Sequence, residues 1–341
     1  MCLKRFINKL FFIILLFNFS FLSAAPPNLI FQHLDLDLPV PNAMLQDHQG
    51  FIWIGSDVGL YRFDGYKLLN FSSNVLNEFS LPHNRVMSLA EDSQHRLWVG
   101  TADGLVLFNR KTHQFKQYLP PFNTATKSKK NRYITEIILD KDKGLWLATR
   151  EGLQYFNFKT EQFHIYLHDA NNPESIHNNN VDTIFMDQQR GLWIATWPKG
   201  VDYLPAGSEK FQHYQINTIL DSPLEKNVRA LFVDQQQRIW LGTEAGIFML
   251  DANQTIASWK NMSQKKVEGM THNFRVQQFA QDQKGTIWAT SMIGLLRWNE
   301  STAYFESYTY EANNIHSIAE NYTYGLLFDK SHSLWIANGK G

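Results

Sequence analysis

The sequence has 341 residues, of which 44% are hydrophobic and 14% aromatic, and its 32 basic and 32 acidic residues give a formal net charge of +0. This composition is that of an ordinary globular protein, and a chain of this length buries about 75% of the surface that it exposes when unfolded. The charge is balanced, with neither a basic field nor an acidic tail, so nucleic acid is not expected as a partner.

The first segment of the chain, residues 1–25, has the layout of a secretory signal peptide. Three basic residues precede an apolar run from Leu10 to Leu22, and small residues follow it. The run is shorter than the roughly 20 residues that a membrane-spanning helix needs, and an uncleaved N-terminal anchor is the alternative. Because the only cysteine, Cys2, lies in this segment, the exported part is expected to fold without disulfides, by packing alone.

A phrase built on tryptophan recurs along the rest of the chain. The stretch "DQQQRIWLGTEAGI", residues 234–247, has close copies in which the tryptophans are 45–48 residues apart. An aspartate stands six positions before each tryptophan, and a glycine follows six or seven positions after it. Gly or Ala stands two positions after the tryptophan in six of the seven repeats. The tryptophans are Trp53, Trp98, Trp146, Trp193, Trp240, Trp288 and Trp335, and the aspartates are Asp47, Asp92, Asp140, Asp187, Asp234, Asp282 and Asp329. A fixed period of this kind is the signature of a repeat protein.

Each repeat contains four short runs suited to β-strands. In the second repeat these are "RVMSLAED", "RLWVGT", "GLVLFNR" and "HQFKQYL", separated by turn residues. No run with helical spacing follows the signal segment. Four antiparallel strands repeated seven times predict an all-β fold, a seven-bladed β-propeller of four-stranded blades over residues 26–341.

The repeated residues are expected to build the scaffold rather than a catalytic site. Each indole would bury against the neighbouring blade, where a large flat side chain fills the wedge between splayed sheets. Each aspartate would accept backbone N–H bonds in the turn after the innermost strand. The small residue after Trp lets the sheets approach near the axis, and the later glycine supplies a positive φ in the next turn.

The ends of the chain predict how the ring closes. The stretch "NLIFQHLDL", residues 28–36, resembles the fourth strands of later repeats, so we expect it to pair with the last blade and close the ring. The last repeat has candidates for its first and second strands only, and the sequence stops at Gly341, where a third strand would begin. We therefore expect the last blade to be incomplete and the chain to be a piece of a longer protein, with a three-stranded last blade as the alternative.

The pattern VxxLxEDxxxRLWVGTxDGLxxFNxxTxxFxxY of residues 86–118, repeated behind a signal peptide, resembles the two-component regulator propeller family. The resemblance covers residues 28–341. It implies the exported, periplasmic sensor module of a hybrid histidine kinase or a diguanylate cyclase, tethered to the membrane through segments beyond residue 341. Effector domains of the same protein are then the downstream partners. Lyases of the streptogramin type share the Gly-x-Trp rhythm and stay open as an alternative.

Candidate ligand-binding residues lie where the repeats differ. In a propeller, the connections from the fourth to the first strand and from the second to the third strand line one face around the axis. The candidates in the second-to-third connections are Arg150, Glu151, Trp197, Lys199 and Glu244, and those near the starts of inner strands are Arg85, Tyr133 and Arg229, with Asn180, His272, Arg275 and Tyr322 at related positions. An exposed tryptophan beside Arg and Glu suits an oligosaccharide or a peptide. Alternatively, Trp197 covers the apolar edge of its own blade, and the polar residues before inner strands cap loop backbones.

Patterns of catalytic or cofactor-binding residues are absent from the sequence. The twelve histidines lack the close pair spacing of metal sites, and no nucleophile elbow, HExxH motif or phosphate-binding glycine loop occurs. We expect no metal, no cofactor and no enzyme activity in this chain. The expected function is ligand or partner sensing, passed on through the orientation or association of subunits, with a homodimer as a candidate state. A free-standing exported enzyme of lyase type and a protein-interaction scaffold are the alternatives.

Overall fold

The computed structural model describes residues 29–34, 36, 38–121, 128–198, 200–214, 227–250, 259–262 and 274–339. The predicted signal peptide at residues 1–25, the site candidate Lys199, His272 and the terminal Gly341 lie outside the described residues. Apart from one 3-10 turn, η1 (Lys130–Arg132), the regular elements of the described chain are β-strands.

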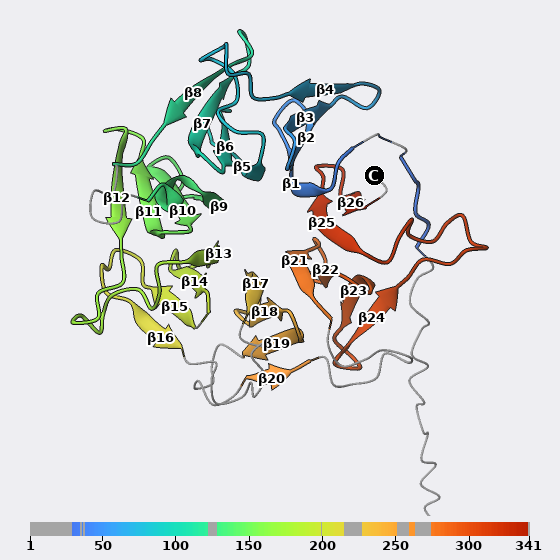
Figure 1. The fold of residues 1–341 in the computed structure, drawn as a ribbon. Coiled ribbons are helices and arrows are strands. Elements are labelled where there is room, and N and C mark those ends of the chain that lie inside the picture. The colour runs from blue at the N-terminus through green and yellow to red at the C-terminus, as the bar shows by residue number, and fades with distance from the viewer. Residues whose placement is uncertain are drawn as a thin grey trace, which may run out of the picture.

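Six four-stranded antiparallel sheets stand around a central axis, and the first strand of each lies nearest to that axis (Figure 1). The first three blades are β1 (Pro41–Gln46), β2 (Ile52–Ser56), β3 (Leu60–Phe63) and β4 (Leu68–Phe71); β5 (Val86–Glu91), β6 (Leu97–Thr101), β7 (Gly104–Asn109) and β8 (Gln114–Tyr118); and β9 (Ile134–Leu139), β10 (Gly144–Thr149), β11 (Gly152–Asn157) and β12 (Gln162–Tyr166). The next three are β13 (Val181–Met186), β14 (Leu192–Thr196), β15 (Val201–Leu204) and β16 (Gln212–Tyr214); β17 (Val228–Val233), β18 (Ile239–Thr243), β19 (Gly246–Leu250) and β20 (Lys260–Asn261); and β21 (Val276–Gln281), β22 (Ile287–Ser291), β23 (Gly294–Asn299) and β24 (Tyr304–Tyr308). In every blade the strands pair in chain order, as a meander.

The last repeat forms only a two-stranded sheet, β25 (Thr323–Phe328) with β26 (Leu334–Asn338), beside the first and sixth blades (Figure 1). The predicted count of seven blades is therefore wrong, because the described residues form six, whereas the all-β class and the four-stranded antiparallel blade are confirmed. The count was predicted from the tryptophan phrase, which spans only the first two strands of a blade. In the second repeat the fourth strand ends 20 residues after Trp98, at Tyr118, but only six residues follow Trp335 in the sequence.

The segment expected to close the last blade, residues 28–36, forms no strand in its described part. The backbone N–H of Phe31 donates to the carbonyl of His316 at 3.0 Å, and the Phe31 ring meets Tyr308 edge-on with centroids 6.1 Å apart. Leu29 and Phe31 pack against the core between the sixth blade and the two-stranded sheet. The segment thus covers this sector of the ring by apolar contact. Closure of the ring by a strand from this segment and the domain limits stay predictions.

Apolar side chains fill the wedges between neighbouring sheets. Trp53 on β2 is fully buried, and its ring meets Phe108 of the second blade with centroids 5.1 Å apart. Trp240 on β18 is likewise fully buried and meets Trp298 of the sixth blade at 5.1 Å. These large rings exclude water from the gap between sheets, which is the main source of stability in a fold with no disulfide in its described part.

Polar bonds also join inner strands of neighbouring blades. At one repeat position, a side-chain oxygen of one inner strand accepts a backbone N–H of the next inner strand. The three bonds are from Ile137 N to Ser88 Oγ (2.9 Å), from Ile184 N to Glu136 Oε2 (2.8 Å) and from Leu326 N to Gln278 Oε1 (3.0 Å). They satisfy backbone groups that would otherwise be left unpaired near the axis.

Candidate functional site

The turn between the second and third strands of a blade presents one side chain at the face around the axis. In the third blade Thr149 Oγ1 donates to the carbonyl of Gly152 at 2.7 Å and accepts the N–H of Glu151 at 3.1 Å, while Gly152 has a φ of +104°. The residue after the threonine, Arg150, donates its N–H to the carbonyl of Tyr133 at 3.2 Å. In other blades the residue at this turn position donates its backbone N–H in the same way, to the carbonyl of the residue just before the inner strand. These residues are Ala102, Trp197, Glu244 and Met292. The hydroxyl that closes the turn was not identified from the sequence, although Ser or Thr occurs there in the first six repeats.

Arg85 joins the first three blades at this face. Its Nε and Nη2 donate to the two carboxylate oxygens of Asp57 at 3.0 and 3.2 Å, and its Nη1 donates to the hydroxyl of Tyr133 at 3.5 Å. The side chains of Arg85 and Asp57 are 42% and 56% exposed, so this forked pair is open to solvent. Asn42 fixes Asp57 from the other side, with a bond of 3.0 Å to Oδ1.

Arg150 continues the contacts into the fourth blade. Its guanidinium lies over the ring of Tyr133, 5.5 Å from the centroid, and its Nη1 donates to Asp182 Oδ1 at 2.7 Å and to Asn180 Oδ1 at 3.1 Å. Burial raises the pKa of Asp182, and the nearby charges of Arg150 and Arg229 act in the opposite direction. The Asp182 side chain is only 8% exposed, so its charge depends on these two arginines.

Glu244 is held between two arginines of the fifth and sixth blades. Its Oε1 accepts from Arg229 Nε at 2.8 Å, and its Oε2 accepts from Arg275 Nε at 2.6 Å. Burial alone would raise the pKa of Glu244, but the bonds from Arg275 and Arg229 outweigh it and keep the pKa below the usual value. Arg275 also reaches the hydroxyl of Tyr322, just before β25, at 3.4 Å.

These side chains form a continuous arc that we call the polar belt. It consists of Asp57, Arg85, Tyr133, Arg150, Asp182, Arg229, Glu244, Arg275 and Tyr322. Its arginines keep N–H donors that the contacts above do not use, and they are 34–42% exposed. Such groups can donate to carboxylate, carbonyl or hydroxyl oxygens of a bound molecule.

The structure brings together most, but not all, of the predicted candidates. Arg85, Tyr133, Arg150, Arg229 and Glu244 are members of the belt. Trp197 lies in the equivalent turn of the fourth blade, where its side chain is 48% exposed. Glu151 is 9% exposed, so it is buried in its turn instead of being presented at the face, and Lys199 lies outside the described residues.

Sequence reasoning missed two acidic members of this arc, Asp57, the partner of Arg85, and Asp182, which lies between Arg150 and Arg229. Asp182 stands at the same position of the inner strand as Arg229, one residue after the strand begins. Asp57 stands at the turn position of Arg150 and Glu244. Aligning the repeats on these two positions would have found both.

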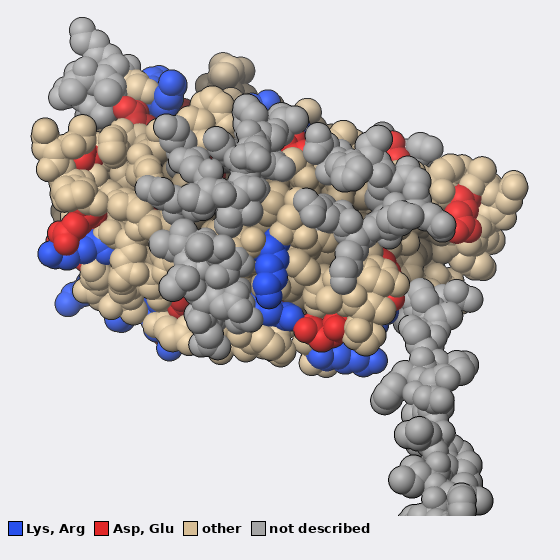
Figure 2. Space-filling model, turned by 90° about the horizontal axis from the view of Figure 1, so that it is seen from below, with Lys and Arg blue, Asp and Glu red and all other residues tan. Residues whose placement is uncertain are grey.

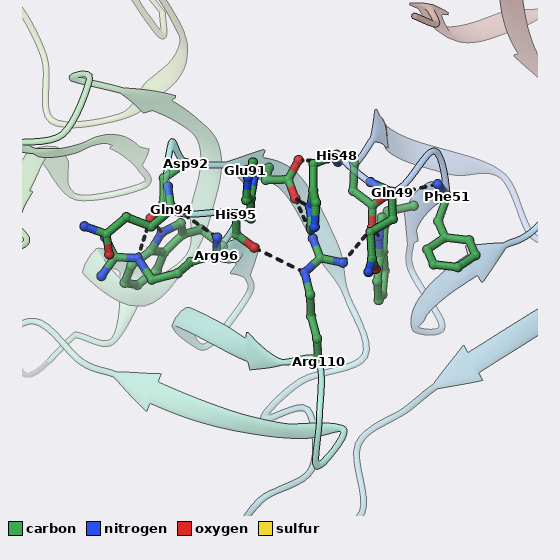
Figure 3. Close-up of polar contacts among 12 residues, drawn as sticks. His48, Gln49, Phe51, Glu91, Asp92, Gln94, His95, Arg96 and Arg110 are labelled. Carbon is green, nitrogen blue, oxygen red and sulfur yellow. Dashed lines mark hydrogen bonds and ion pairs between the residues drawn. The ribbon is translucent and has the colours of Figure 1, made fainter.

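A second polar cluster joins the aspartate turns of the first two blades. Figure 3 shows Arg110 reaching from below toward His95 and Glu91; its Nη2 donates to Glu91 Oε1 at 2.7 Å and its Nε to the carbonyl of His95 at 3.2 Å. Its Nη1 donates to the fully buried Asp47 at 2.6 Å. Because the Arg110 guanidinium donates hydrogen bonds to groups of two adjacent blades, this cluster holds the two blades together.

The described residues on the side drawn in Figure 2 form no strongly charged region. On the rim visible in Figure 2, acidic and basic side chains are scattered among neutral ones, in line with the net charge of +0. A cleft of about 1210 Å³ lies beside the two-stranded sheet, where apolar residues such as Ile54, Phe63 and Leu334 line it, and no residue of the polar belt lines it. No helix in the described part of the chain is long and apolar enough to cross a membrane.

Two groups of histidine and carboxylate side chains come together within the described residues, although the sequence predicted no metal site. One is His48, Glu91 and His95, and the other is His177, Asp202 and His213. Members of the second group are 25 and 11 residues apart in the sequence, a spacing that matches no metal-binding motif.

Comparison with known families identifies the repeats. The family described as "Two component regulator propeller" matches residues 80–103 and 222–245, which confirms the resemblance drawn from the tryptophan phrase. No curated protein matches the sequence.

Solved structures share the fold. The extracellular domain of a hybrid two-component system from B. thetaiotaomicron has 21% identity and a TM-score of 0.74, with 92% of this chain and 41% of that chain covered. The extracellular domain of a one-component system from the same organism has 22% identity and a TM-score of 0.71, with 92% and 39% covered. Virginiamycin B lyase from Staphylococcus aureus has 14% identity and a TM-score of 0.65, with 91% and 96% covered. This chain therefore spans about two fifths of the two extracellular domains.

Proposed function

We propose that this chain, whose repeats match the two-component regulator propeller family, is the periplasmic input propeller of a membrane-bound signalling protein. It binds a ligand or partner at the polar belt, and binding changes how subunits are oriented or associated. The fold shared with extracellular domains of two-component systems supports this proposal, and the predicted signal peptide is consistent with it. The effector would be a kinase or a cyclase of the same protein.

The observation that carries the proposal is the composition of the belt. Scaffold positions repeat the same residue types in each blade, but the turn position after the second strand carries Asp57, Arg150, Trp197, Glu244 or Met292 in different blades. Because equivalent positions carry different side chains, the face is chemically asymmetric around the axis. Such a face can orient one ligand in one way.

The belt suits a ligand that carries oxygen acceptors and a flat apolar part. Arginine N–H groups can pair with carboxylate or hydroxyl oxygens, and the half-exposed indole of Trp197 offers a stacking surface. An acidic oligosaccharide or a peptide has both features. The fold shared with a lyase favours a second candidate, a free-standing enzyme acting on an exported substrate. Such an enzyme would convert the bound compound into a product, whereas a sensor would release it unchanged.

The test is a thermal-shift screen of the purified protein against oligosaccharides and peptides, followed by calorimetric titration of each hit. Arg150→Gln and Trp197→Ala should each weaken binding at least about tenfold, since central Arg and Trp residues carry much of the binding energy of such sites. Lys284→Ala, an exposed change in the aspartate turn of the sixth blade, is the matched control and should leave binding unchanged.

Two results would count against the sensor proposal. Hits whose affinity is the same in Arg150→Gln and in wild type would remove the polar belt from the binding site. Conversion of a hit into product, followed by mass spectrometry, would favour the lyase-type enzyme instead.

A further inference from the structure

A carboxylate occupies a core position in the fourth blade. Asp202 on β15 is 0% exposed and lies opposite Ile194 of β14. At the same register position, the third strands of four other blades carry buried apolar or aromatic residues: Tyr61, Val106, Phe248 and Leu296. A buried carboxylate in such a place is strongly unfavourable unless a cation or several donors surround it.

Two histidines converge on this carboxylate from different segments. His213 on β16 places Nδ1 2.7 Å from Asp202 Oδ1, and His177, in the loop before β13, places Nδ1 3.3 Å from the same oxygen. The other carboxylate oxygen, Oδ2, accepts the backbone N–H of His177 at 2.8 Å. Asp202 therefore has one oxygen held by the backbone and one directed at both imidazoles.

The hydrogen bond made by Nε2 of His213 determines where the proton of the neutral ring sits. Its Nε2 is 2.7 Å from the carbonyl oxygen of Pro173, and a contact of that length requires Nε2 to carry a proton. In the neutral ring, Nδ1 then has a lone pair that faces a carboxylate oxygen. Two acceptors at this distance repel each other unless a proton or a metal ion lies between them. A ring N–H bonded to a backbone carbonyl is also the arrangement that orients most metal-binding histidines.

We propose that His177, Asp202 and His213 bind a divalent transition-metal ion of the Zn²⁺ type. Zn²⁺ has bonds of about 2.0–2.2 Å to imidazole nitrogen and carboxylate oxygen, so tetrahedral ligands stand about 3.3 Å apart. The His177–Asp202 separation already has this value, and the His213–Asp202 separation must open by about 0.6 Å. The imidazole rings meet edge-on, at 75°, and the histidine side chains are 32% and 28% exposed, which leaves the remaining coordination positions open to water.

The site would fasten the loop before β13 to the outer half of the fourth blade. This loop ends at Asn180, whose carbonyl accepts the backbone N–H of Trp197 at 2.9 Å and whose side chain accepts from Arg150. Gly200 allows the approach, because a Cβ there would stand 3.0 Å from His177 Nδ1. The bound ion thus acts beside the polar belt as a structural clamp.

The other histidine–carboxylate group provides the contrast. There His48 Nδ1 faces Glu91 Oε1 at 2.6 Å, but Arg110 Nη2 donates to that same oxygen at 2.7 Å (Figure 3). The guanidinium already supplies the positive charge and repels a second cation. His48 and His95 are therefore suitable positions for a control.

The experiment is a titration of the EDTA-treated protein with Co²⁺, followed by visible absorption, with Zn²⁺ as competitor. We expect one Co²⁺ per chain, with the intensified absorption of a four- or five-coordinate ion, and displacement by Zn²⁺. Asp202→Leu and His213→Gln should each weaken binding at least about 100-fold, since loss of a ligand costs no less than loss of an outer-shell partner. The double variant His48→Ala/His95→Ala should bind as wild type does.

Leucine occupies the equivalent position in the sixth blade, so Asp202→Leu is expected to fold, and circular dichroism checks this. His213→Gln changes a partly exposed residue and tests the site independently of the core. Unchanged Co²⁺ binding in His213→Gln, or loss of binding in the His48→Ala/His95→Ala control alone, would overturn the proposal. Absence of Co²⁺ or Zn²⁺ binding in wild type would show that a proton, rather than a metal ion, joins these side chains.

Discussion

The indole Nε1 of Trp240 donates a hydrogen bond to Oδ2 of Asp234 at 2.8 Å, and both side chains are buried. The other carboxylate oxygen accepts the backbone N–H of Arg238 at 2.8 Å, so one aspartate both closes the turn after β17 and orients the indole of β18. Equivalent Trp–Asp bonds of 2.7–3.2 Å occur in five further repeats. In the third repeat Asp140 accepts from the Tyr155 hydroxyl at 2.9 Å. The tight turn and the ring that fills the wedge are thus one structural unit.

Replacing a buried and an exposed tryptophan should lower stability to very different extents. Trp240→Ala removes a fully buried ring and the indole donor to Asp234, so it should lower the free energy of unfolding by about 3–5 kcal/mol. Trp197→Ala removes a ring that is 48% exposed and should change this free energy by less than about 0.5 kcal/mol. Urea unfolding followed by circular dichroism measures both. Similar losses in the two variants would contradict the assignment of Trp240 to the scaffold.

Glu136 should make the junction between the third and fourth blades sensitive to pH. Its Oε2 accepts from the Thr183 hydroxyl at 2.6 Å and from the Ile184 N–H at 2.8 Å. Burial raises the pKa of Glu136 from 4.5 to about 7, and the two hydrogen bonds, which lower it, do not offset this.

Since the folded state keeps this proton more tightly than the unfolded state, the contribution of Glu136 to stability is fully present below pH 4.5. It is lost as pH rises through about 7, by about 3 kcal/mol in total. Glu136→Gln keeps an acceptor and has no charge, so this decline should disappear from the variant. Denaturant midpoints between pH 4.5 and 8 measure it, and parallel curves for variant and wild type would contradict the prediction.

Glu244→Gln should destabilise the protein at neutral pH more than at acid pH. The substitution removes the charge shared by Arg229 and Arg275, and we expect a loss of about 1–3 kcal/mol at pH 7. The pKa of Glu244 is held below its usual value in the folded state, so its contribution to stability is present above pH 4.5 and lost as pH falls further. The difference between variant and wild type should therefore shrink toward pH 3. A difference that does not depend on pH would indicate a steric cause.

Gly294 should tolerate no side chain. Its φ is +130°, and a Cβ there would stand 2.3 Å from the carbonyl oxygen of Tyr308 in the neighbouring strand. Gly294→Ala should cost about 2–4 kcal/mol, from backbone strain and from displacement of β24. Gly207→Ala is the matched control, because Gly207 has a φ of +75° but no atom within 4 Å of its Cβ position. The control should cost about 1–2 kcal/mol, and equal losses would show that strain alone matters.

Much of the scaffold could be predicted from the sequence because its contacts are local. The aspartate of one unit lies in the turn of a hairpin and the tryptophan lies six residues later on its second strand, so they recur at a fixed spacing that is visible in the sequence. The blade count was predicted from the same spacing, and it was wrong. A repeat phrase marks the first two strands of a blade and carries no information on whether the outer two strands follow.

The polar belt could be predicted only in part. The arginines and Glu244 were identified because they stand where the repeats differ, but the acidic partners of Arg85 and Arg150 were not. Arg85 meets Asp57 28 residues away, and Arg150 meets Asp182 32 residues away, across blade boundaries. The His177–Asp202–His213 group escaped notice for the same reason, because its members come from a loop and two different strands.

By itself, the sequence determined the repeat, the strands and the turn chemistry of this protein, because neighbours along the chain create those features through hydrogen bonds and side-chain alternation. The tertiary structure alone decided which charges meet and which carboxylate is buried beside histidines. Those outcomes depend on contacts between separate sheets, and such contacts exist only once the sheets have packed around a common axis.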